Sequence, residues 1–187
     1  MNFIFLRNLF DIIFKPHEFF KNIKNMEINE SVFYFIKLLF ISSAILISTH
    51  LFIVRTGLLD AILSVFIAIG LMYVSIIAYF AFFIIIAVIF NFIKIIKIKK
   101  PKNPGKEKIA LLYSSTIFII FFTVGLVFSI AIEEKNLFSR FFIYLSHLWV
   151  VYFAISMYYV YETEIKFIIW LFIALLAWII KMIIIPI

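Results

Sequence analysis

Two histidines, His50 and His147, are the side chains best suited to chemistry within this apolar sequence. Ionisable groups at membrane depth are costly to bury and are therefore often functional. We consider three roles for them: neutral histidines hydrogen-bonded to nearby hydroxyls, a route for protons or small solutes, and a metal site. Hydroxyl residues share the predicted helical face of each histidine: Ser42, Ser43 and Thr49 with His50, and Tyr144, Tyr158 and Tyr161 with His147.

A metal site at these histidines would need carboxylate partners, and Asp60, Glu133 and Glu134 fall near the same, outer side of the predicted membrane. Histidine and carboxylate together can bind zinc. However, the sequence has no HExxH motif and no two such ligands three or four residues apart on one helix. It also has no cysteine, which excludes thiolate ligands, disulfides and a thiol nucleophile. We therefore predict no metal, no cofactor and no enzymatic activity, with His50 and His147 in structural roles.

Five apolar runs must position these residues, and they predict a membrane protein. Of 187 residues, 66% are hydrophobic and 14% are charged, with a mean hydropathy of +1.20. A helix of about 20 apolar residues crosses a hydrocarbon core of about 30 Å. We expect an all-α bundle in residues 31–187, with the second run forming one long helix that is tilted, bent near Gly70, or projecting past the bilayer. The five spans are expected at about 33–54, 61–93, 109–132, 139–161 and 165–185.

A basic stretch from Lys94 to Lys108 sets the predicted orientation, because it holds seven of the 17 Lys and Arg residues. Lys and Arg accumulate in cytoplasmic loops. A cytoplasmic N-terminus puts thirteen basic residues inside and four outside, so we expect a cell-membrane protein with its C-terminus outside. Lys97, Lys99 and Lys100 could attract anionic lipid, at about 1 kcal/mol per charge, or the loop could be a topology signal alone. No nucleic acid is expected, since the loop has no aromatic residue on which bases could stack.

Residues 1–30 form a separate segment in which apolar residues recur near helical spacing and charged residues alternate with them. This pattern is typical of a helix that lies in the membrane interface. Pro16 suits the first position of a new helix, so we expect two short helices that meet at Lys15 and Pro16. The segment either caps the bundle or docks on lipid or a partner. The predicted interface residues are Pro16, Phe19, Phe20, Lys21 and Lys24.

Small residues line one face of each of two predicted spans. They let helix backbones approach closely in lipid, so these faces are expected to pack against other helices. A polar pathway is the alternative, although no charged residue lies deep in either helix. The seam of the second span carries Ser64, Ala68, Ser75 and Ala78, and that of the third carries Ser114, Gly125 and Ser129.

Short motifs in this order resemble the Yip domain family, the Ypt/Rab-interacting membrane proteins and their prokaryotic relatives. LFDIIFKPHEFFKNIK precedes five spans, LLYSS opens the third and LSHLW lies in the fourth. Pro16, Phe19 and Phe20 match the Pro-x-x-Phe-Phe entry of the family, and Tyr113 and Ser114 match its Tyr-Ser. The resemblance implies a non-enzymatic protein that associates with others in the bilayer and influences membrane shape or trafficking.

The chain departs from the family pattern at three places. STIFII replaces the proline expected after Tyr-Ser, Ser156 or Met157 replaces the glycine that ends the fourth span, and no long hydrophilic N-terminal region precedes the spans. Binding of Rab-type GTPases is therefore not expected. The predicted function is membrane organisation or association with copies of itself or other membrane proteins. The alternative is a small transporter or channel that uses His50, His147 and the outer acidic residues.

Overall fold

The chain forms an all-α bundle in this computed structural model, which describes residues 3–55, 57–92, 105–132, 137–161 and 167–184. Within these residues, five helical stretches are long and apolar enough to span a membrane, which confirms the predicted fold class. The stretches are Ile28–Val54, Leu58–Ile89, Lys106–Ile132, Leu137–Tyr161 and Phe167–Ile184.

Two short helices precede the first long one, and they meet at Lys15 as the position of Pro16 predicts. A 3-10 turn (Ile23–Asn25) follows them, and a π-helical segment (His50–Val54) ends the first long helix. The helices are α1 (Phe3–Phe14), α2 (Pro16–Lys21), α3 (Ile28–Thr49), α4 (Leu58–Phe92), α5 (Lys106–Ile132), α6 (Leu137–Ser146), α7 (Trp149–Tyr161) and α8 (Phe167–Ile184).

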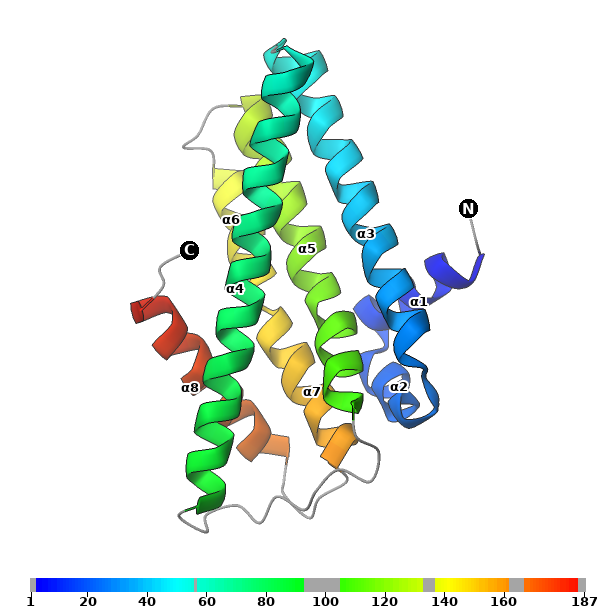
Figure 1. Cartoon of the computed structure of the whole chain (residues 1–187), viewed down its shortest axis with the longest axis vertical. Helices are drawn as coiled ribbons and strands as arrows, with labels where there is room; N and C mark the ends of the chain where they lie inside the picture. Colours follow the sequence, from blue (N-terminus) through cyan, green and yellow to red (C-terminus); the bar gives the residue numbers. More distant parts are fainter. Residues whose placement is uncertain (1–2, 56, 93–104, 133–136, 162–166, 185–187) are drawn as a thin grey trace.

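Helix α5 lies at the centre of the bundle, packed against α3, α6 and α7. It is buried almost without interruption from Ile109 to Ile119, which suits a helix with neighbours on several sides. Helices α3 and α4 run the length of the molecule, and α1 and α2 lie beside the lower part of α3 (Figure 1). The N-terminal helices are therefore positioned by α5 and α7, and by α3 through the contact of Phe5 with Tyr34.

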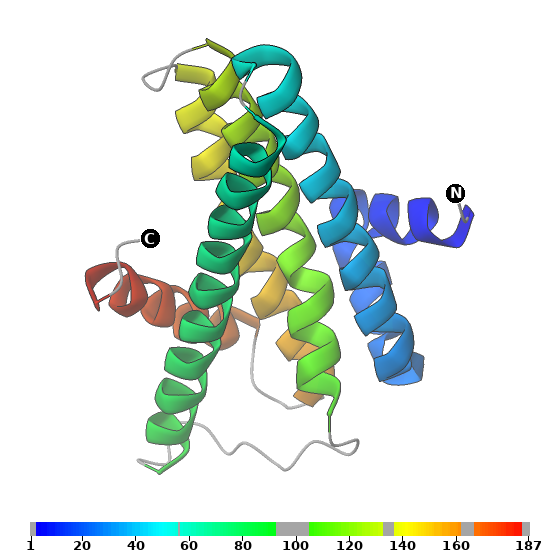
Figure 2. The ribbon, with the colours of Figure 1, turned by 45° about the horizontal axis from the view of Figure 1, so that its top comes forward.

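Helix α8 crosses α4 at a steep angle and ends level with the middle of α4 (Figures 1 and 2). Its basic residue Lys181 is only 3% exposed. A lysine near the end of a membrane span can extend its long side chain to the lipid headgroups. Lys181 does not, because the steep crossing of α8 buries it in the bundle.

Helix α4 is one continuous helix of 35 residues, about 52 Å long, as expected for the second run. Its buried stripe includes Val65, Tyr79 and Phe83, so large side chains do much of the packing.

The small residues predicted for the α4 seam are only partly in contact with protein. Ser75 is buried, Ala68 and Ala78 are half-buried, and Ser64 is exposed. The prediction is wrong for Ser64, because the buried stripe is rotated by one residue toward Val65.

The fourth span is broken between α6 and α7, which the sequence pattern did not predict. The hydroxyl of Ser146 donates a hydrogen bond to the carbonyl of Ile143 at 2.6 Å. That carbonyl would otherwise accept from the backbone N–H of His147, which instead donates to Tyr144 at 3.1 Å. His147 and Leu148 form a turn at this point, and competition of this kind from serine can bend helices.

The small residues predicted on α5 lie on its packed side. Ser114 and Gly125 are buried and Ser129 is half-buried. Gly125 sits against α6, where an added Cβ would lie 3.2 Å from the backbone oxygen of Ser139. Glycine therefore allows α5 and α6 to approach closely, as the predicted packing role requires.

Candidate functional site

Helix α2 inserts its two phenylalanines into the bundle. Phe20 is fully buried and Phe19 is 7% exposed, with its ring centroid 5.0 Å from that of Tyr113 on α5. The prediction that Phe19 and Phe20 contact lipid is therefore wrong, because protein covers both rings. Of the two roles left open for this segment, capping of the bundle describes α2.

Hydrogen bonds also fasten the N-terminal segment to the bundle. The hydroxyl of Tyr152 donates to the carbonyl of Ile13 at 2.9 Å, and the ammonium of Lys106 donates to the carbonyl of Met26. The exposed ring of His17 lies 3.2 Å from the hydroxyl of Tyr159. The segment is thus held at several points along its length.

Helix α1 has two apolar faces, of which only one is covered by protein. Phe5 and Ile12 are buried against the bundle. Leu6, Phe10 and Phe14 lie about 120° or more around the helix from Ile12, at about 100° per residue, and are 45%, 54% and 66% exposed. The ring centroids of Phe10 and Phe14 lie 4.7 Å apart, so the two rings contact each other. We call Leu6, Phe10 and Phe14 the free face of α1.

A polar strip that includes Arg7 and Asp11 separates these two faces on one side of α1, whereas the half-buried Leu9 and Ile13 connect them on the other. The strip borders a cavity of about 480 Å³ between α1 and α2, which is rich in charged groups. A helix with this order of faces can pack on protein, contact lipid and meet water at the same time. The polar lining includes Arg7, Asp11, Lys15 and Glu18.

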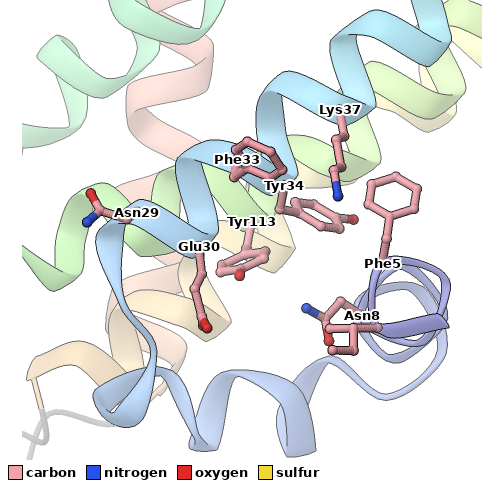
Figure 3. A pocket seen from close by; sticks show the side chains of 9 residues that line it. Phe5, Asn8, Asn29, Glu30, Phe33, Tyr34, Lys37 and Tyr113 are labelled. Carbon is pink, nitrogen blue, oxygen red and sulfur yellow. The ribbon is translucent and has the colours of Figure 1, made fainter. Parts of the chain in front are cut away.

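A second cavity, of about 440 Å³, opens where α1 crosses α3. Its inner wall is aromatic, with ring centroids 5.1 Å apart for Phe5 and Tyr34 and 5.0 Å apart for Tyr34 and Tyr113. We call this cavity the α1–α3 cleft. Figure 3 shows that Glu30 and Lys37 flank Tyr34 on the side of α3 that meets α1, and Asn8 of α1 faces them.

His50 and His147 belong to different parts of the fold. His50 begins the π-helical segment after α3 and is half-buried. His147 lies at the break in the fourth span, where its Nδ1 accepts a hydrogen bond from the indole N–H of Trp178 at 3.3 Å. Lys181 interacts electrostatically with the same ring. The described residues contain no group of three or more histidines and acidic side chains that could hold a metal ion.

The remaining predicted interface residues are only partly described. Pro16 is half-buried and Lys21 is exposed. The structure does not describe the side chain of Lys24. Lys97, Lys99 and Lys100 lie outside the described residues.

Sequence reasoning predicted an interfacial helix in residues 1–30 but chose Phe19 and Phe20 as its interface residues, and it missed the α1–α3 cleft. The free face is visible in the sequence, since Leu6, Phe10 and Phe14 follow helical spacing four residues apart. The cleft depends on where α1 packs against the bundle, so no local sequence pattern predicts it.

In comparisons with known proteins, no family model, no curated protein and no solved structure matches the chain. The resemblance to the Yip domain family therefore stays a prediction.

Proposed function

We propose that this chain is a non-enzymatic protein of the cell membrane that organises the bilayer through α1, as the resemblance to the Yip domain family also implies. The observation that carries the proposal is the pair of apolar faces on α1. One face is fixed to the bundle, and the free face (Leu6, Phe10 and Phe14) is available to lipid. The excess of Lys and Arg on one side of the membrane, thirteen against four, favours a cytoplasmic N-terminus and an outer C-terminus.

The position of α1 along α3 supports this role. From Leu38 to Val54, α3 and its π-helical end carry no acidic or basic residue apart from His50, and these 17 residues correspond to about 26 Å of helix. That length approximates the hydrocarbon core of a bilayer. Since α1 meets α3 between Glu30 and Lys37, it would lie at the depth of the cytoplasmic headgroups.

A helix at this depth adds area to one leaflet and none to the other. Full burial of a Leu or Phe side chain stabilises by about 1.5–3 kcal/mol. About half of each free-face side chain is available, which gives about 3 kcal/mol for the three together. Because α2 locks the segment to the bundle, α1 would act as a fixed wedge, and basic side chains such as Lys21 would add attraction to anionic lipid.

The transporter alternative receives no specific support from the geometry. It needs a polar path through the membrane, whereas His147 is hydrogen-bonded to Trp178. Association with copies of the chain or with other membrane proteins is compatible with the wedge and is part of the proposal.

Reconstitution of the full chain into vesicles tests the proposal. At increasing protein density, the unmodified chain should shift the diameters seen by electron cryomicroscopy toward smaller vesicles. The variant Leu6→Ser/Phe10→Ser/Phe14→Ser should lose this shift. Phe10→Leu/Phe14→Leu, which keeps the face apolar, is the matched control. Equal diameters for the unmodified chain and the serine variant would refute the wedge.

A further inference from the structure

We propose that the α1–α3 cleft binds a single phospholipid whose headgroup carries both a phosphate and a primary ammonium. The inference goes beyond the wedge, since it concerns the cleft rather than the free face of α1. It rests on the order of the charged and apolar groups along α3.

Charge complementarity indicates a zwitterionic headgroup. The cleft presents one carboxylate, Glu30, and one ammonium, Lys37. They are seven residues apart on α3, about 10 Å along the helix axis, so they lie toward opposite ends of the cleft. A headgroup with only negative charge would satisfy Lys37 but would be repelled by Glu30.

The direction of this charge pair matches the orientation of a lipid in the leaflet. Glu30 lies two residues into α3, whereas Lys37 is the last charged residue before the apolar part of that helix. A phospholipid places its amine outermost, its phosphate deeper and its acyl chains deepest. Glu30 therefore faces the amine and Lys37 the phosphate.

The surface beyond Lys37 suits an acyl chain. Phe40 lies one turn beyond Lys37 on the same side of α3 and is 74% exposed. The ammonium of Lys37 lies 4.7 Å from the centre of the Phe33 ring, on the headgroup side of this surface. The cleft thus continues into a lipid-facing surface without a polar interruption at these positions.

The amine is best matched as a primary ammonium rather than a quaternary one. Quaternary ammonium groups are held by the open faces of several aromatic rings. Here Phe5, Tyr34 and Tyr113 are 6%, 5% and 2% exposed, so their faces are packed against neighbours. Phe33, the other aromatic residue of the cleft, is 63% exposed, but its ring already lies 4.7 Å from the ammonium of Lys37 and is one ring rather than several. The accessible acceptors are oxygens, those of Glu30 and the Asn8 amide, which need N–H donors.

Native mass spectrometry of the full-length chain tests the proposal. The purified protein would be offered phosphatidylethanolamine, phosphatidylglycerol and phosphatidylcholine with the same acyl chains in equal amounts. We expect phosphatidylethanolamine to be retained about tenfold more than either competitor, since a charge-assisted hydrogen bond corresponds to tenfold or more in affinity. Equal retention of the three lipids, or retention of none, would overturn the proposal.

Variants separate the two ends of the cleft. Glu30→Gln should reduce phosphatidylethanolamine to the level of phosphatidylglycerol, whereas Lys37→Gln should weaken both. Arg140→Gln, which changes an exposed basic residue on α6 outside the cleft, is the control and should leave retention unchanged. Circular dichroism would verify the fold of each variant. Variants at Glu30 and Lys37 that behave like Arg140→Gln would refute the assignment.

A charge exchange distinguishes lipid binding from an internal ion pair. In Glu30→Lys/Lys37→Glu both charges remain but their order along α3 is reversed. A headgroup of fixed orientation should not bind to this variant, and retention should stay about tenfold below that of the unmodified chain. If this variant retains phosphatidylethanolamine as well as the unmodified chain does, Glu30 and Lys37 act as an internal ion pair, and the proposal fails.

Discussion

Replacement of Gly125 by alanine should destabilise the bundle, because no space exists for a Cβ at this position. The added atom would lie 2.8 Å from Cγ1 of Ile143, 3.1 Å from the backbone nitrogen of Ile143 and 3.2 Å from the backbone oxygen of Ser139. The Ile143 side chain can rotate away from the first contact. The two backbone contacts can be relieved only if α6 moves away from α5.

Two opposing effects set the change in the free energy of unfolding that Gly125→Ala causes. Overpacking of this kind costs about 1–3 kcal/mol. Alanine favours the helix over glycine by about 1 kcal/mol, which offsets part of that cost. We expect Gly125→Ala to lower the free energy of unfolding by about 1–2 kcal/mol, and Gly125→Val to lower it further.

Gly70→Ala is the matched control, since a Cβ at Gly70 would meet no atom within 4 Å. It should leave stability unchanged or raise it by up to about 1 kcal/mol. The free energies would be measured by unfolding in mixed micelles with increasing SDS, followed by circular dichroism. If Gly125→Ala is as stable as Gly70→Ala, the close approach of α5 and α6 is wrong.

Three further predictions concern other parts of the bundle. Phe20→Ala should lower the unfolding free energy by about 3–5 kcal/mol in the same SDS assay, because the ring is fully buried; a loss below 1 kcal/mol would contradict the capping role of α2. His147→Leu and Trp178→Phe should show a coupling energy of about 1 kcal/mol in a double-mutant cycle, and additive effects would exclude their hydrogen bond. In intact cells, a membrane-impermeant thiol reagent should label Ile187→Cys and spare Lys102→Cys, and the reverse pattern would refute the proposed topology.

The sequence predicted the helices because their apolar runs and Pro16 act locally. It misassigned Phe19 and Phe20 for a physical reason: in a membrane protein both lipid and protein interior favour aromatic residues. Helical periodicity then shows that a face is apolar but not what covers it. Ser64 was misplaced for the same reason, since the exposed and buried sides of α4 are both apolar.

Features that depend on tertiary contacts could not be predicted from local sequence patterns. The break at His147 has no proline or glycine in the sequence to indicate it, and it coincides with the hydrogen bond from Ser146 to the carbonyl of Ile143. Glu30 and Lys37 look like ordinary helix-end charges until α1 docks beside them. The candidate site was therefore less predictable than the fold.

The depth of α1 in the bilayer is the most direct test of the proposed function. The chain has no cysteine, so Phe10→Cys and Asp11→Cys can each carry a single environment-sensitive fluorophore in the full-length protein reconstituted in vesicles. These neighbours differ by about 100° around α1. The label at position 10 should be quenched by nitroxide lipids and the label at position 11 by aqueous iodide. Quenching of both labels by iodide, with no effect of nitroxide lipids on position 10, would contradict the wedge.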